Sequence, residues 1–132
     1  MDGTVYTSNV WKNNNGADAA QTYGKMSTFN GEILGTLMLR GANWQITFII
    51  DSITFVPGSA GEIAIVTGHG EFFRGLGHEH ASGYIQLTDG VGTYDLLSYT
   101  IKNQAGAVLV SADKLMRSRG TLAITPLANL SA

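Results

Sequence analysis

The chain has 132 residues, of which 14% are charged, 17 are glycine and none is cysteine. This length fits one domain, residues 1–132, with a core that needs no disulfide or metal support, and the lack of cysteine excludes disulfides, thiol nucleophiles and thiolate metal sites. The net charge is −2 and no basic cluster could follow a phosphate backbone, which argues against a nucleic-acid partner.

Short apolar or alternating runs begin at the N-terminus, where residues 4–11 (TVYTSNVW) predict a first strand. Residues 13–24 (NNNGADAAQTYG) predict a loop with at most one helical turn. Residues 32–40 (EILGTLMLR) and 43–55 (NWQITFIIDSITF) predict two strands of a meander. In the second of these, alternation places Trp44, Ile46, Phe48 and Ile50 on one face, and Gln45, Thr47, Ile49 and Asp51 on the other.

The second half of the chain repeats this pattern. The predicted strands are residues 61–66, 78–87, 93–102, 105–111 and 120–125, the last of which ends before Pro126. Only residues 111–119 (SADKLMRSR) predict a helix, with Ser111 as its cap and Leu115 and Met116 facing inward. Seven to nine strands with at most one or two short helices predict an all-β barrel or sandwich.

Residues 68–77 (GHGEFFRGLG) place four glycines around two phenylalanines. A phosphate-binding loop would need a helix to follow, but the next residues, 78–87, predict another strand. Glycines in an antiparallel sheet instead allow the bulges and bends that close a barrel. We therefore interpret this segment as a structural bend in which Phe72 fills the interior or the end of a barrel.

Residues 61–102 resemble the segment shared by allene oxide cyclases and dirigent proteins, in which an apolar strand runs into Gly-x-Gly-x-Phe-x-x-small-x-Gly. The matching positions are Gly68, Gly70, Phe72, Gly75 and Gly77. The resemblance implies a single eight-stranded antiparallel β-barrel with a central cavity and at most one or two short helices. The same architecture serves small cofactor-free cyclases, including spirotetronate-forming Diels–Alderases. No catalytic residue of these families can be matched outside the quoted segment.

Candidate site residues are chosen by strand alternation and by aromatic or polar character. Tyrosine and tryptophan rings, which carry a polar O–H or N–H group, suit a hydrophobic polyene or phenolic ligand. An arginine at a strand end suits an acidic group of the substrate. A carboxylate inside a cavity would have a raised pKa and could act as a general acid. The carboxylates beside apolar neighbours are Glu32, Asp51 and Asp95. The catalytic candidates are Trp44, Tyr94, Asp51 and Arg40, and the substrate-binding candidates are Phe48, Met38, Phe72, Tyr84, Tyr99, His78 and His80.

His78 and His80 are two residues apart on a predicted strand, so both rings point to one side and Glu79 points to the other. Such a pair is how a cupin-type metal site begins. No glutamate follows at short spacing and no later histidine completes a ligand set, so we expect no metal and no cofactor. If the histidines point outward, Glu79 is expected to point into the barrel.

Three hypotheses for the function follow. The first is a cofactor-independent cyclase that folds a reactive polyketide-like or polyene-like substrate for stereoselective ring closure, such as a Diels–Alder reaction. The second is a dirigent-like or lipocalin-like binder without catalysis, and the weaker third is a metal-dependent enzyme using His78 and His80. The expected partners are a small hydrophobic molecule and further copies of the chain, with neither nucleic acid nor membrane. We expect a cytoplasmic rather than a secreted protein.

Overall fold

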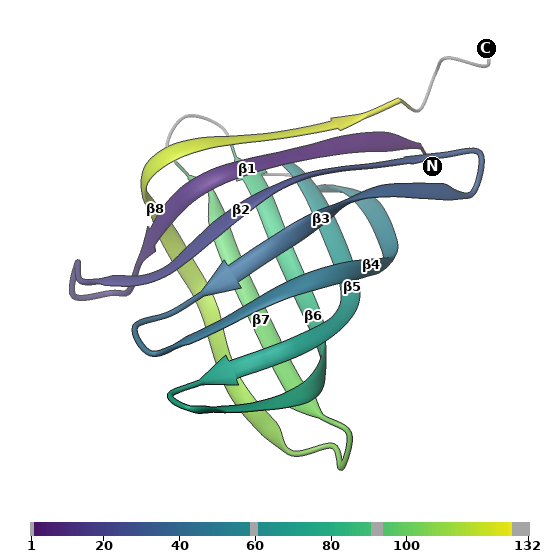
Figure 1. Ribbon diagram of the computed structural model, residues 1–132. Helices are drawn as coiled ribbons and strands as arrows, with labels where there is room; N and C mark the ends of the chain where they lie inside the picture. The colour runs from purple at the N-terminus through teal and green to yellow at the C-terminus, as the bar shows by residue number, and fades with distance from the viewer. Residues whose placement is uncertain (1, 59–60, 91–93, 128–132) are drawn as a thin grey trace.

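The computed structural model describes residues 2–58, 61–90 and 94–127. They form a closed barrel in which each strand pairs antiparallel with its neighbours in sequence and β8 closes onto β1 (Figure 1). The strands are β1 (Gly3–Lys12), β2 (Asp18–Phe29), β3 (Glu32–Arg40), β4 (Trp44–Gly58), β5 (Gly61–Arg74), β6 (Gly77–Gly90), β7 (Leu96–Asn103) and β8 (Val108–Pro126). The predicted all-β, eight-stranded antiparallel barrel is therefore confirmed.

The helix predicted for residues 111–119 is wrong, because this segment is the bent middle of β8. It pairs with β7 and then with β1, and the pairing register shifts on both sides. Lys114 has a φ of 53°, and its backbone N–H donates to Ser98 Oγ, whose hydroxyl donates to Asp113. Strand pairing on both edges outweighs the helical preference of a short polar run. Among the described residues there is no helix, and hence none long and apolar enough to cross a membrane.

The loop predicted for residues 13–24 is shorter than expected, because β2 begins at Asp18. Asn13 closes the remaining turn: its backbone N–H donates to the carbonyl of Ala17, and its side-chain oxygen accepts from Asn15 and Ala17. Asparagine side chains stabilise such turns by replacing backbone partners. The predicted end of the last strand at Pro126 is confirmed.

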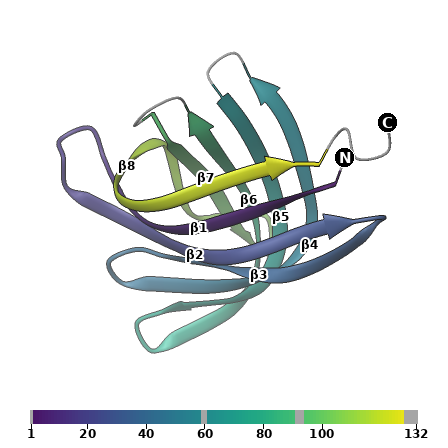
Figure 2. The same ribbon diagram turned by 90° about the horizontal axis from the view of Figure 1, so that it is seen from above.

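The connections between strands fall at two ends of the barrel (Figures 1 and 2). The mouth end, as we call it, carries the connections at residues 13–17, 41–43, 75–76 and 104–107. The opposite end carries the first residues of β1, the last residues of β8 and the turn at residues 30–31 between β2 and β3. The β2–β3 hairpin is long and projects at this opposite end.

The barrel interior is filled by side chains. Phe48 is fully buried, and its ring lies against the backbone of Gly68 and Gly83 on β5 and β6. A Cβ atom at Gly83 would lie 2.6 Å from that ring, and one at Gly68 would lie 3.0 Å from Phe48 Cβ. Glycine is required at these positions because the aromatic ring occupies the space of a side chain. The other large side chains that are fully buried include Trp11, Met26, Leu37, Leu39 and Ile46.

This packing predicts the effect of adding one methyl group. We expect Gly83→Ala to lower the free energy of unfolding by about 1–3 kcal/mol, because the methyl group would overlap the Phe48 ring. Gly77→Ala is the matched control on the same strand, since a Cβ there has its nearest neighbour at 3.7 Å. Phe48→Leu should recover part of the loss in the Gly83→Ala background. Equal stabilities of the two alanine variants in urea denaturation would contradict this account.

Candidate functional site

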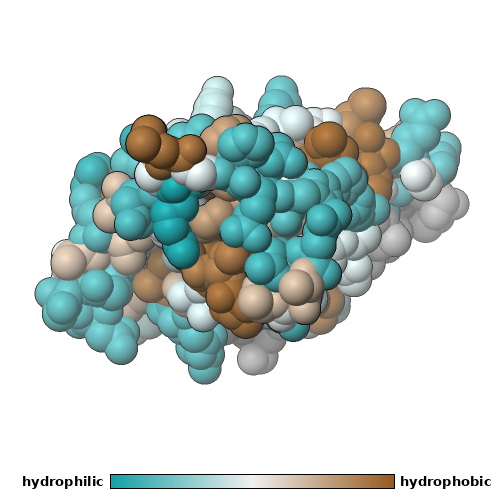
Figure 3. Space-filling view, turned by 60° about the horizontal axis from the view of Figure 1, so that its bottom comes forward, coloured by the Kyte–Doolittle hydropathy of each residue, from teal (hydrophilic) through white to brown (hydrophobic). Residues whose placement is uncertain are grey.

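An open cleft of about 480 Å³ lies at the mouth end. Its wall is built from β1, the start of β2, the connection between β3 and β4, and the end of β5. Trp44, Val10, Ala19 and Ala20 supply apolar surface, while the polar groups include those of Arg40 and Gln21. Figure 3, which brings the bottom of Figure 1 forward, shows apolar surface in the middle of this face with hydrophilic side chains around it.

Trp44 joins the cleft to the core. The indole stacks on Phe72 with a centroid distance of 5.7 Å and packs against Tyr99 at 5.6 Å. The ring stands over Gly41, where a Cβ atom would lie 2.3 Å from the indole nitrogen. The tight turn, closed by the bond from Gly41 N–H to the Trp44 carbonyl, therefore fixes the orientation of the indole. The structure thus brings together three of the candidates, Trp44, Phe72 and Tyr99.

Arg40 supplies the positive charge at the cleft. Its Nε donates to Gln21 Oε1 at 2.7 Å, and the side chain forms no ion pair with any described residue. The remaining guanidinium N–H groups can donate to an acidic or carbonyl group in the cleft. Arg40 and Trp44 are therefore the two candidates that line the cleft directly.

Two further groups lie close to the aromatic stack of Trp44 and Phe72. Burial raises the pKa of Tyr99, so its hydroxyl stays protonated and can act as a hydrogen-bond donor. The guanidinium carbon of Arg74 lies 5.0 Å from the Phe72 ring centroid, and the same side chain donates to the carbonyl of Leu109 at 2.8 Å. The Arg74 guanidinium and the Tyr99 side chain are therefore held close to the stacked rings of Phe72 and Trp44 at the mouth end.

A chain of buried polar side chains runs between β1 and β2. Thr7 and Thr22 share a hydroxyl hydrogen bond of 2.5 Å, Trp11 Nε1 donates to Thr22 at 2.9 Å and Asn9 Nδ2 donates to Thr7 at 2.6 Å. Asn9 Oδ1 is buried and accepts no hydrogen bond from any described residue. Sequence reasoning missed this group. The signal was the alternation in the first strand, which places Val5, Thr7, Asn9 and Trp11 on one face.

Asp95 is the most buried carboxylate among the described residues, with 2% of its surface exposed. Its Oδ1 accepts from the Gly90 N–H at 3.1 Å, and its Oδ2 pairs with Arg117 Nε at 3.2 Å. Burial raises the pKa of Asp95, while Arg117 opposes the shift. The carboxylate therefore joins Gly90, the last residue of β6, to Arg117 of β8, away from the mouth end.

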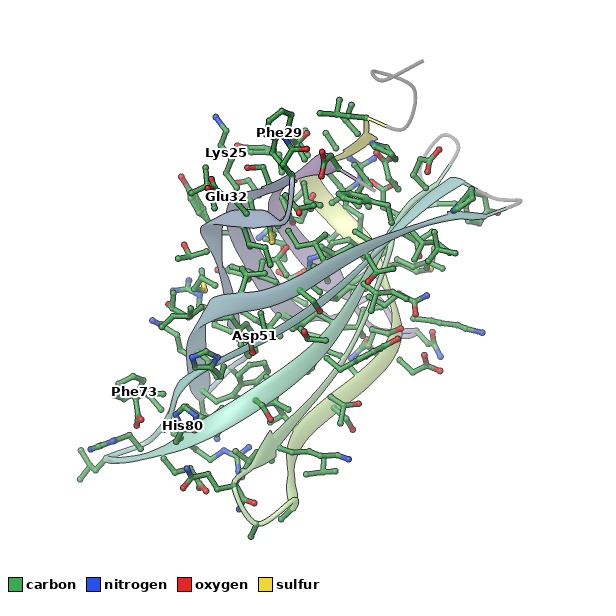
Figure 4. All side chains as sticks on the ribbon, turned by 90° about the vertical axis from the view of Figure 1, so that its right-hand side faces the viewer. Lys25, Phe29, Glu32, Asp51, Phe73 and His80 are labelled. Carbon is green, nitrogen blue, oxygen red and sulfur yellow. The ribbon has the colours of Figure 1, made fainter. Side chains whose placement is uncertain are left out.

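All three histidines of the chain lie on the outer wall formed by β4, β5 and β6. His69 Nδ1 lies 2.9 Å from Asp51, and Glu71 lies 3.0 Å from His78 and 3.8 Å from His80. In Figure 4, Asp51, Phe73 and His80 appear on one side of the molecule. In the part of the chain that the structure describes, no three histidine or acidic side chains are arranged to hold a metal ion.

The other candidates lie away from the cleft. Phe48 is in the core, Met38 is half-buried on the outer face of β3, and Tyr84 and Tyr94 are 49% and 68% exposed. Asp51, His78 and His80 are on the outer wall. Glu79, expected inside if the histidines point outward, is exposed as well. It lies in the first residues of β6, next to the exposed hairpin at residues 75–76.

Comparisons of the chain with protein-family models, with curated proteins and with solved structures found no significant match.

The raised pKa of Asp95 predicts a dependence of stability on pH. A carboxyl whose pKa is higher in the folded than in the unfolded state contributes stability below its ordinary pKa, and this contribution is lost as the pH rises through the folded value. Asp95→Asn removes the titration. We therefore compare the free energies of unfolding of Asp95→Asn and wild type by urea denaturation. The value for Asp95→Asn minus the value for wild type should increase as the pH rises from the ordinary pKa of an aspartate through the higher pKa of folded Asp95. A difference that decreases with pH would mean that the Arg117 ion pair outweighs burial.

Proposed function

We propose that the protein binds a small molecule with a flat apolar part and an acidic or carbonyl group in the cleft at the mouth end. The observation that carries the proposal is that Trp44 and Arg40 line one open cleft, the first presenting an aromatic ring and the second unpaired guanidinium donors. Binding sites of this kind combine apolar walls with a few fixed polar groups that orient the ligand.

The packing of the interior supports a position at the mouth. Phe48, Trp11 and the aliphatic side chains around them are fully buried, and Phe48 lies directly on the backbone of two strands. A ligand that entered deeper would have to displace close-packed side chains, which is costly. The dirigent-like or lipocalin-like alternative is therefore proposed in a modified form, with the ligand held against Trp44 at the end of the barrel.

The cyclase remains a second candidate because of the Tyr99 and Arg74 groups that lie close to the aromatic stack. A substrate folded against Trp44 would lie near the protonated Tyr99 hydroxyl and the Arg74 guanidinium, either of which can polarise a carbonyl group. An intramolecular ring closure such as a Diels–Alder reaction gains and loses no atoms, and its barrier is largely the cost of bringing the two reacting ends together. A surface that holds these ends close to each other would therefore supply most of the acceleration. Neither the binding function nor the cyclase function requires a cofactor.

Anilinonaphthalene sulfonate, an aromatic anion, tests the binding proposal. We expect Trp44→Ala and Arg40→Gln each to raise its dissociation constant about tenfold, because each removes one of the two groups that the probe would contact. Fluorescence titration measures the constant. Tyr84→Ala is the control, since it removes an exposed ring of the outer wall. If both cleft variants bind the probe as wild type does, the cleft is not the binding site.

The cyclase is tested with a polyene that carries an activated carbonyl group and cyclises slowly in water. Wild type should accelerate ring closure, and Tyr99→Phe should lower the rate while leaving substrate affinity near the wild-type value, because the hydroxyl would act on the reacting carbonyl. Chiral chromatography of the product measures both rate and stereoselectivity. Substrate that binds without any acceleration would leave only the binding function.

A further inference from the structure

A second hollow of about 350 Å³ adjoins the cleft and extends over β8, β1, β2 and β3. Val10 and Gln21 line both spaces, so the two lie side by side on β1 and β2. The lining of the hollow also includes the exposed ring of Tyr23 and the side chain of Arg119. We call the cleft and this hollow together the extended cleft. It brings a residue of β8 within reach of a molecule that lies in the cleft.

Two arginine side chains approach β2 from opposite sides. Arg40 of β3 donates from Nε to Gln21 Oε1 at 2.7 Å, and Arg119 of β8 donates from a terminal nitrogen to Asp18 Oδ2 at 3.4 Å. Because β8, β1, β2 and β3 follow one another around the barrel, Arg119 crosses β1 to make this contact (Figure 1). Asp18 and Gln21 are three residues apart on β2, which is about 10 Å along a strand. Two long arginine side chains can close this distance around one anionic group.

Positive charge exceeds negative charge in the extended cleft, although the whole chain has a net charge of −2. Lys12 lies opposite Asp18 in the pairing of β1 with β2. Together with the two arginines, it places three positive charges around one carboxylate. Asp18 is the only acidic residue among the described residues that line the extended cleft. Its ion pair with Arg119 is more than half exposed on both sides, so an anionic ligand can compete for this arginine.

We propose that the ligand of the cleft is an aromatic phosphate monoester, whose phosphate is held between Arg40 and Arg119 while its ring packs on Trp44. The inference rests on the proposed binding function and specifies the acidic group of the ligand. A phosphate monoester carries nearly two negative charges at neutral pH and three acceptor oxygens, so it can accept hydrogen bonds from two guanidinium groups at once. A carboxylate or a sulfonate carries one charge and would leave part of the local positive charge uncompensated.

Isothermal titration calorimetry with two probes that share one ring system tests the proposal. The probes are naphthyl phosphate, mostly a dianion at about pH 7.5, and naphthalene sulfonate, a monoanion. We expect the phosphate to bind wild type about tenfold more tightly than the sulfonate does, because its second charge meets a second arginine. Equal affinity for the two probes would overturn the phosphate inference and leave the binding function intact. If neither probe binds, the binding function fails together with the inference.

Arg119→Gln tests the assignment of the second arginine. We expect it to raise the dissociation constant of naphthyl phosphate about tenfold and that of naphthalene sulfonate by about twofold or less, because only the phosphate uses both guanidinium groups. Lys102→Gln is the matched control, since it removes the same charge from an exposed position on β7 that does not line the extended cleft. Equal effects of the two variants on phosphate binding would contradict a specific role of Arg119.

Asp18→Asn tests the carboxylate beside the proposed phosphate position. In a phosphate site this carboxylate repels the ligand and competes with it for Arg119, so its removal should lower the dissociation constant of naphthyl phosphate about threefold. Asp18 is exposed at the start of β2, which makes the substitution compatible with folding. Weaker binding of the phosphate by Asp18→Asn would overturn the proposal, because the carboxylate would then hold Arg119 in place or bind a cationic group of the ligand.

Discussion

Phe48 lies across the backbone of Gly68 and Gly83, and this contact determines how much room the barrel leaves for anything else. The Phe48 ring of β4 fills the space beside the backbones of β5 and β6. The surrounding aliphatic side chains fill the rest of the interior. A closed and filled barrel confines ligand binding to its ends or outer wall. The cleft beside Trp44 is consistent with this constraint, because there the stack of Phe72, Trp44 and Tyr99 leads from the core to the surface.

Strand alternation predicted the all-β class, whereas the eight-stranded barrel was implied by the family resemblance. Trp44, Ile46, Phe48 and Ile50 do share one side of β4, and the glycines around Phe72 do belong to a bent strand rather than a phosphate loop. The helix at residues 111–119 was wrong because local preference carries no information about β1 and β7, which pair with this segment on either side. The resemblance to allene oxide cyclases and dirigent proteins stays a prediction.

The site was predictable only in part. Trp44 and Arg40 were recognisable as an aromatic residue and a cation at strand ends, and the structure brings them to one cleft. Alternation does not say which face of a strand is inside, so Tyr84, His78, His80 and Asp51 became candidates although they face outward. The Asn9 oxygen that accepts no hydrogen bond from any described residue lies where β1 pairs with β8, and these two strands are far apart in sequence. No local sequence pattern indicates such a contact.

Binding of a small molecule at the mouth of a filled barrel can be tested by native mass spectrometry of the protein purified from its own host, with Trp44→Ala produced in the same way. We expect wild type to retain a small organic molecule with an aromatic or polyene part and an acidic or carbonyl group, and Trp44→Ala to lose it. Equal retention by the two proteins would show that the ligand does not bind at Trp44, and one transition-metal ion per chain in place of an organic ligand would rule out the proposed binding function.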